Sequence, residues 1–162
     1  MYKTAKEMYF AYECNEYRMK QDDVLDEYKR YNVSTEEQIA WKNEYVEMLF
    51  DKLVSSNDIR VFSELSCISR DCTSNTYILE KLVDYWLTTD KTDIEKEFSL
   101  SFSLLNAINP FVIRKSVDIS KQALNIVDTS MHNVISNTRL ECTKRVARNC
   151  CSEIDRLKNK YI

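Results

Sequence analysis

Glycine is absent from this chain of 162 residues, and proline occurs once, at Pro110. Average usage would give roughly eleven glycines and eight prolines in this length. Tight turns and bulges in β-rich folds need glycine or similar residues. The composition therefore argues for helices joined by short polar turns. Phosphate-cradling loops of the P-loop and dinucleotide-binding types are excluded, because they also need glycine.

Histidine is nearly absent, since His132 is the single one. Cysteine and serine nucleophiles normally work with a nearby general base, usually a histidine. One histidine near an expected helix start is better explained as a surface residue or a cap, and it stands ten residues from Cys142. No C-x-x-C pair or Cys/His ligand spacing indicates a zinc site. We therefore expect a protein that is not an enzyme, with no catalytic residue, no metal site and no cofactor.

Long apolar runs are absent too, and none approaches the ~18 residues of a membrane span. Residues 1–7 lack the apolar core of a signal peptide, but Met1 could be an initiator added to a mature chain whose signal was removed. The even number of cysteines, six, favours an oxidising compartment. We expect a secreted mature chain without a membrane span.

The net charge of −3 is unevenly distributed. Residues 1–58 hold 13 acidic and 8 basic side chains, whereas residues 129–162 hold 3 acidic and 7 basic ones. An acidic and a basic segment in one chain more often attract each other than recruit nucleic acid. The acidic total also disfavours a protein that follows a phosphate backbone, so we expect no nucleic-acid partner.

Helical patterns extend through the whole chain. Capping-box patterns begin at Thr4, Ser34 and Thr92, and the clearest helical periodicity follows Ser34. Residues 5–31 read as one bent helix or two. The sequence therefore predicts an all-α fold, a compact disulfide-stabilised bundle of six to eight helices with a long C-terminal helix. Residues 1–162 are expected to form a single domain, with two helical halves of about 1–90 and 91–162 sharing one core as the alternative.

The last third of the chain, Thr129 to Ile162, is expected to be the long helix. A helix rises about 1.5 Å per residue, so its cysteines cannot reach one another for a disulfide. If all cysteines are oxidised, each of these three must pair with one of the other three, which leaves six of fifteen connectivities. Reduced, buried cysteines are the alternative. The expected disulfide cysteines are Cys14, Cys67, Cys72, Cys142, Cys150 and Cys151.

Tyrosine is abundant, and it is concentrated near the N-terminus. Tyrosine is enriched at protein interfaces, where its ring and hydroxyl serve apolar and polar contacts together. These rings could equally pack the core with their hydroxyls at its edge. The candidate partner-binding residues are Tyr9, Tyr12, Tyr17, Tyr28 and Tyr31.

The cysteine and tyrosine landmarks carry a resemblance to a known family. They fall in two halves, Cys14, Tyr45, Cys67 and then Cys72, Tyr85, Cys142. This pattern resembles the bicycle family of aphid salivary effectors, which carry paired cysteine–tyrosine–cysteine motifs. The resemblance implies a secreted effector that manipulates a host.

The sequence thus favours a secreted, non-enzymatic effector or binding protein that contacts a host macromolecule, with a host protein as the expected partner. Two alternatives stay open. The chain could be a helical carrier that encloses a small apolar ligand. It could also be an intracellular viral-type interaction protein with reduced cysteines.

Overall fold

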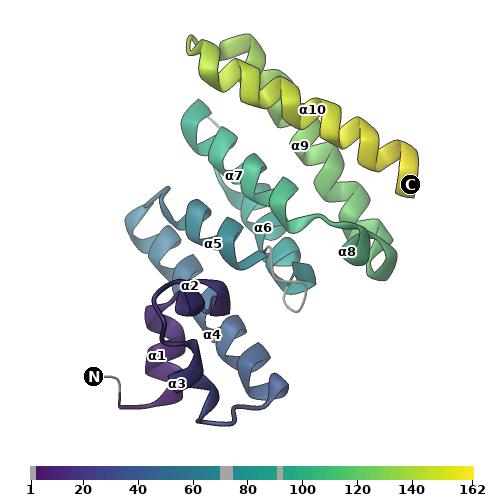
Figure 1. Cartoon of the computed structure of the whole chain (residues 1–162). Coiled ribbons are helices and arrows are strands. Elements are labelled where there is room, and N and C mark those ends of the chain that lie inside the picture. Colours follow the sequence, from purple (N-terminus) through teal and green to yellow (C-terminus); the bar gives the residue numbers. More distant parts are fainter. Residues whose placement is uncertain (1–2, 70–74, 91–92) are drawn as a thin grey trace. The chain divides into compact units, whose positions relative to one another are not determined.

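The computed structural model of the chain describes residues 3–69, 75–90 and 93–162 (Figure 1). These residues form ten α-helices and no strand, which confirms the predicted all-α fold and corrects the expected number of six to eight helices. The chain divides into two compact units, Met1–Ser74 and Asn75–Ile162, termed here the N-terminal and the C-terminal unit. That both units belong to a single domain with one core stays a prediction.

Residues 5–31 form three short helices, where one or two were expected. The breaks fall where the backbone takes a positive φ, at Glu13 (54°), Cys14 (55°) and Asp23 (59°). A left-handed residue cannot continue a right-handed helix, and it costs a residue with a Cβ about 1–2 kcal/mol. The three helices are α1 (Ala5–Ala11), α2 (Glu16–Gln21) and α3 (Leu25–Lys29).

The first two expected helix starts are confirmed. The Thr4 hydroxyl accepts a hydrogen bond from the Glu7 amide at 3.1 Å and so caps α1. Ser34 and Glu37 form a complete capping box before α4 (Thr35–Ser56), in which each side chain accepts from the other residue's amide. These contacts satisfy amides that lack a partner within the helix.

The core of the N-terminal unit is aromatic at one end. Tyr9 and Tyr28 are almost completely buried, and their rings stack with centroids 5.4 Å apart. Trp41 of α4 lies against Tyr9 at 6.3 Å. The helix α5 (Val61–Ser69) packs on α4 and completes the unit. Buried stacked rings of this kind combine a large apolar area with about 0.5–1.5 kcal/mol of specific attraction per pair.

The C-terminal unit is built around α9, which packs against α7 and α10. Asp93 caps α7 by accepting from the amides of Glu95 and Lys96 at 2.9 and 3.2 Å. The cap predicted one residue earlier, at Thr92, lies outside the described residues. The helices of this unit are α6 (Asn75–Thr88), α7 (Ile94–Ala107), α8 (Pro110–Lys115), α9 (Val117–Asn137) and α10 (Glu141–Tyr161).

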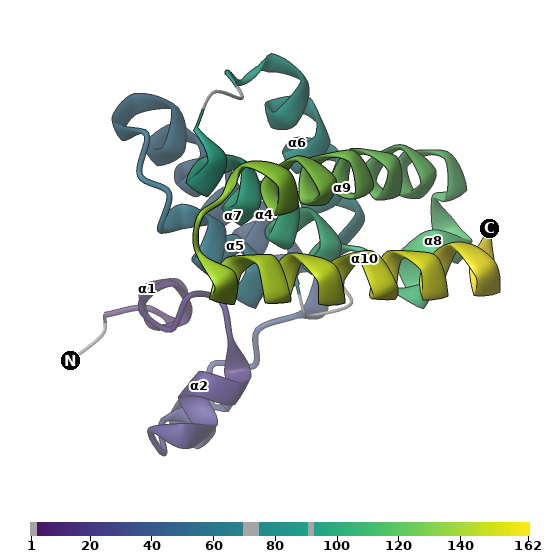
Figure 2. The same ribbon diagram turned by 90° about the horizontal axis from the view of Figure 1, so that it is seen from above.

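The segment from Thr129 to Ile162 is not one helix. It contains the second half of α9 and all of α10, separated at Thr138 and Leu140, which both have extended backbone angles. The two helices lie side by side and run in opposite directions (Figures 1 and 2). This hairpin buries the apolar face of α10 against its neighbours, which one continuous helix could not do. The coarser prediction of a long C-terminal helix is confirmed by the 21 residues of α10.

None of the described helices combines the length and the apolar character that crossing a bilayer requires. The prediction that the chain has no membrane span is confirmed for these residues.

The expected disulfides are not supported. Cys14, Cys67, Cys142, Cys150 and Cys151 are all free thiols. Within α10 the cysteines cannot bond to one another, as the helix geometry predicts, because Cys142 and Cys150 stand about 12 Å apart along the axis. Cys150 faces the core while Cys142 is exposed. Cys72 lies outside the described residues.

Candidate functional site

The turn between α1 and α2 positions the residues of the candidate site. The chain reverses at Cys14, whose amide donates to the Tyr9 carbonyl at 2.8 Å. Asn15 then begins α2, because its side-chain oxygen accepts from the amides of Tyr17 at 2.9 Å and Arg18 at 3.3 Å. Tyr17 and Arg18 are therefore held in the first turn of α2 by a cap and by a left-handed turn.

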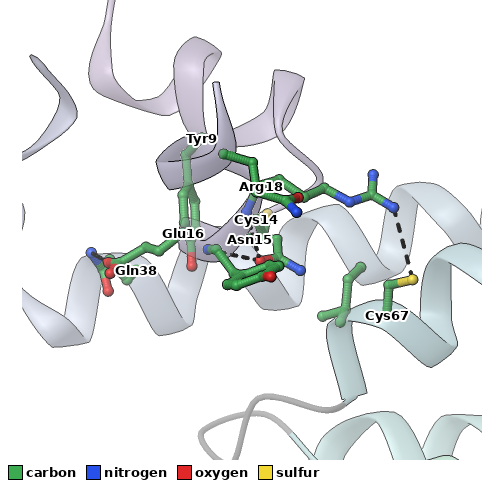
Figure 3. A pocket seen from close by; sticks show the side chains of 10 residues that line it. Tyr9, Cys14, Asn15, Glu16, Arg18, Gln38 and Cys67 are labelled. Carbon is green, nitrogen blue, oxygen red and sulfur yellow. Dashed lines mark hydrogen bonds between the residues drawn. The ribbon is translucent and has the colours of Figure 1, made fainter. Parts of the chain in front are cut away.

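A pocket of about 640 Å³ lies beside this turn, within the N-terminal unit (Figure 3). Arg18 also borders two smaller pockets, of about 310 and 330 Å³, in the same unit. We term these three hollows, which share Arg18, the Arg18 groove. The largest is lined by Tyr9, Cys14, Asn15, Glu16, Tyr17, Arg18, Gln21, Gln38, Cys67 and Ile68.

The Arg18 guanidinium is held from two sides. It forms an ion pair with the Glu13 carboxylate, and its Nη2 lies 3.8 Å from the Cys67 Sγ of α5. Burial opposes the charge, but the hydrogen bond and the charge of Glu13 outweigh burial and raise the pKa of Arg18. The second carboxylate oxygen of Glu13 is buried and accepts no hydrogen bond from the described part of the chain. The groove therefore holds a fixed cation whose charge is balanced by a neighbouring carboxylate.

The five tyrosines predicted as a partner surface occupy different environments. Tyr9 and Tyr28 are buried in the core. Tyr12 is half-buried and borders one of the smaller pockets. Tyr17 is 67% exposed and borders the largest pocket, whereas Tyr31 is 43% exposed and borders none of the three. Their role in binding stays a prediction, and Tyr17 alone among them is both exposed and part of the groove.

The Cys14 thiol, one of two cysteine thiols that line the groove, is a poor nucleophile. Cys14 is 2% exposed, and burial raises its pKa from 9.0 to about 12, with Lys42 lowering it slightly and Glu13 raising it. The thiolate is the reactive form of cysteine. At neutral pH this thiol is protonated, so the groove is suited to binding and not to nucleophilic attack by Cys14.

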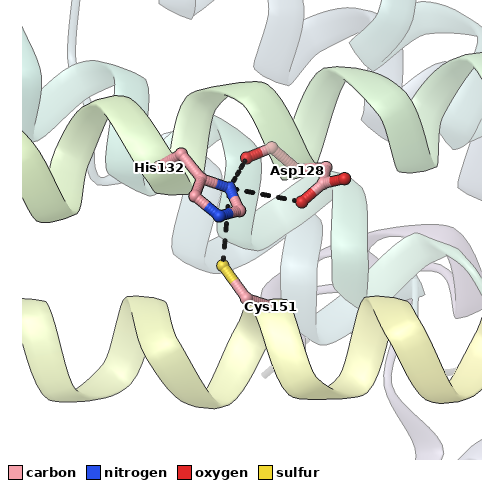
Figure 4. Close-up of side chains that lie close together, drawn as sticks. All are labelled: Asp128, His132 and Cys151. Carbon is pink, nitrogen blue, oxygen red and sulfur yellow. Dashed lines mark hydrogen bonds and ion pairs between the residues drawn. The ribbon is translucent and has the colours of Figure 1, made fainter.

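A second cluster of chemically active side chains lies in the C-terminal unit (Figure 4). Asp128 and His132 stand one turn apart on α9, and Cys151 reaches them from α10. The His132 Nδ1 is 2.9 Å from the Asp128 carbonyl, 3.3 Å from its carboxylate and 4.0 Å from the Cys151 Sγ. The single-helix interpretation of this segment missed the cluster, although the i, i+4 spacing of Asp128 and His132 was visible in the sequence.

This cluster does not have the geometry of a cysteine protease-type triad. In such a triad one ring nitrogen faces the nucleophile and the other faces the orienting group. Here the same nitrogen, the His132 Nδ1, faces the thiol, the carboxylate and the carbonyl. Burial and the charges of Asp128 and Asp155 also raise the pKa of Cys151, which disfavours a thiolate nucleophile.

The two candidate sites thus differ in character. The Arg18 groove is a set of hollows with one exposed aromatic residue, Tyr17, and the α9–α10 cluster is a compact group of three potential metal ligands. No protein-family model, no curated protein and no solved structure matches the chain, so any function must be argued from these residues themselves.

Proposed function

We propose that this chain is a non-enzymatic binding protein that recognises a protein partner through the Arg18 groove. The observation that carries the proposal is the coincidence of three hollows around Arg18 with the exposed ring of Tyr17. Arginine and tyrosine are among the residues that most often dominate binding energy at interfaces. The left-handed turn and the Asn15 cap fix the backbone of both residues before any partner arrives, which lowers the entropic cost of binding.

The lining of the groove supports a partner that offers both apolar and hydrogen-bonding groups. Asn15, Gln21 and Gln38 supply neutral donors and acceptors, while Tyr9 and Ile68 supply apolar surface. The charge of Arg18 is largely compensated by Glu13, so a strongly acidic partner is not required. A side chain with an apolar stem and a polar end fits this combination best.

The helical carrier of a small apolar ligand is the second candidate. The volume of the largest pocket, about 640 Å³, falls in the range of small-molecule sites, which is roughly 300–1,000 Å³. Five of its ten lining residues carry charged or amide side chains, which suits the mixed side chains of a protein partner better than a wholly apolar ligand. Native mass spectrometry of the protein from its source separates the two, since a co-purifying small molecule would support the carrier.

Secretion and an effector role in a host remain part of the proposal. The free thiols of the five described cysteines fit the alternative of an intracellular interaction protein with reduced cysteines. The intact mass of the chain with and without reduction distinguishes the secreted, disulfide-bonded chain from the intracellular, reduced one, because three disulfides lower the mass by about 6 Da. A chain from its source that shows no such loss would remove the cysteine argument for secretion.

The binding proposal is tested with matched tyrosine variants. Immobilised wild-type protein is used to capture partners from the tissue or cell in which the chain acts, and each captured protein is then purified and titrated. Tyr17→Ala and Arg18→Gln should weaken binding at least about tenfold, as loss of an interface anchor does. Tyr31→Ala, which removes an exposed tyrosine outside the groove, should leave the affinity unchanged. Equal affinities for all four proteins would refute recognition through the groove.

A further inference from the structure

We propose that Asp128, His132 and Cys151 bind a Zn²⁺ ion that connects α9 to α10. A carboxylate oxygen, a ring nitrogen and the thiol sulfur of these residues lie within 4.8 Å of one another (Figure 4). Two ligands come from neighbouring turns of one helix and the third from the helix beside it. The site is independent of the Arg18 groove, because all its residues belong to the C-terminal unit.

The distances suit tetrahedral zinc with little movement. Zinc–ligand bonds of about 2.0–2.3 Å place tetrahedral ligand atoms roughly 3.3–3.8 Å apart. The His132 Nδ1 lies 3.3 Å from the Asp128 Oδ1 and 4.0 Å from the Cys151 Sγ. Side-chain rotations that move these atoms by a fraction of an ångström therefore bring them to ligand spacing, while the two helices keep their positions. Thiolate, imidazole and carboxylate are also the three ligand types that zinc accepts most readily.

The Asp128 carbonyl orients the His132 ring in the absence of a metal. A carbonyl oxygen can only accept, so the 2.9 Å contact means that the His132 Nδ1 donates its proton to this carbonyl. Zinc binding at the Nδ1 replaces this hydrogen bond, and the ring then carries its proton on the Nε2. The side chain of His132 is 69% exposed, so solvent can exchange the proton between the two ring nitrogens.

Lys158 orients the Asp128 carboxylate. Its Nζ holds the Asp128 Oδ2 at 2.8 Å and leaves the Oδ1 directed to His132. The ligand oxygen of this carboxylate is therefore fixed in position in the absence of a metal.

Zinc binding replaces the thiol proton and leaves one coordination position for solvent. The Cys151 S–H bond breaks, a zinc–sulfur bond forms, and the proton passes to the buffer. The side chain of His132 is 69% exposed, so water can enter and occupy the fourth position. Three protein ligands with one open position is an established zinc geometry.

The test is a metal titration of the full chain and of matched variants. Zn²⁺ binding is measured by competition with a chromogenic chelator, and Co²⁺ is used as a spectroscopic probe of thiolate ligation. The wild-type chain should bind one Zn²⁺ in this site and show a thiolate-to-cobalt charge-transfer band. Cys151→Ser and His132→Gln should abolish the band and weaken Zn²⁺ binding by roughly tenfold or more, since loss of even a supporting contact costs 10–100-fold.

Cys142→Ser is the matched control, because Cys142 is an exposed cysteine on the same helix. It should bind both metals as the wild type does. Circular dichroism of the metal-free variants checks that each remains helical, which is expected because His132 is exposed and Cys151 is only half-buried. The proposal is refuted if the wild type binds no Zn²⁺, if Cys151→Ser and His132→Gln bind as tightly as the wild type, or if Cys142→Ser loses the cobalt band.

Discussion

Raising the pH from 8 to 10 should destabilise the N-terminal unit through a single buried thiol, that of Cys14. Its pKa is about 12 in the folded chain and 9.0 when the group is unperturbed. Because the folded pKa is the higher one, the protonated thiol contributes stability that is complete below pH 9. That stability is lost as the pH rises from 9 towards 12, since the unfolded chain ionises while the folded chain cannot.

The size of the effect follows from proton linkage. At pH 8 almost no unfolded thiol is ionised, and the loss is below about 0.1 kcal/mol. At pH 10 about nine tenths of the unfolded thiol is ionised, and the free energy of unfolding falls by about 1.4 kcal/mol. This is a measurable fraction of the stability of a small helical unit.

The assay is urea unfolding at pH 8, 9 and 10, followed by tryptophan fluorescence. The chain has two tryptophans, and a Trp86→Phe background leaves Trp41 of the N-terminal unit as the only reporter. The comparison is with Cys14→Ala, which keeps a Cβ at the left-handed position but cannot ionise. The fall in the free energy of unfolding between pH 8 and pH 10 should be smaller in Cys14→Ala than in the wild type by about 1.4 kcal/mol.

Other ionisations are common to both proteins and cancel in this difference. The pKa values of Tyr28 and Tyr45 are raised, chiefly by burial, so they add to the alkaline loss in both proteins. Cys142→Ala, which removes an exposed thiol, should retain the full wild-type loss. An equal loss in the wild type and in Cys14→Ala would show that the Cys14 thiol is not protected by burial and would refute the reasoning.

Three further predictions concern other parts of the chain. Asp23→Gly should stabilise the protein by about 0.5–1 kcal/mol in urea unfolding, because glycine removes the cost of a positive φ, whereas Asp23→Ala should give no gain. Tyr9→Ala should cost about 3–5 kcal/mol in the same assay, since it empties a buried aromatic stack; a loss under 1 kcal/mol would contradict that packing. Iodoacetamide should modify exposed Cys142 before buried Cys150, whose pKa burial raises to about 11, and peptide mass spectrometry would reveal the opposite order.

Helix starts were predictable where a local chemical pattern decides them. Ser34 and Glu37 satisfy each other's amides without help from distant residues, so their spacing alone placed the start of α4 correctly. The helix α7 is capped by Asp93, the residue after the predicted cap Thr92, which lies outside the described residues. Short-range hydrogen bonds of this kind can be predicted from the spacing of residues in the sequence.

Helix ends were much less predictable, because the usual signal is missing. Most chains place glycine at left-handed positions, and this chain places Glu13, Cys14, Asp23, Asn32 and Asn57 there. A glutamate or a cysteine in a sequence does not indicate a left-handed turn. The sequence also gives no signal for the break between α9 and α10, because neither glycine nor proline lies between them. In both places tertiary packing, and not local preference, ends the helix.

The candidate sites could be predicted only in part, for the same reason. Tyr17 was identified as an interface residue by its type, but the role of Arg18 depends on the turn before it and on α5. His132 and Cys151 are 19 residues apart in sequence, and only the α9–α10 hairpin brings them to 4.0 Å. A helix assumed to be continuous would have kept them far apart.

The order of helices in the α9–α10 hairpin also affects how the chain emerges during synthesis. The helix α10 is made after α9, and it covers one side of α9. Until the 21 residues of α10 have left the ribosome, α10 cannot cover that side of α9. A premature stop before Glu141 would therefore yield a product with a permanently uncovered apolar strip, the kind of surface that chaperones and proteases recognise.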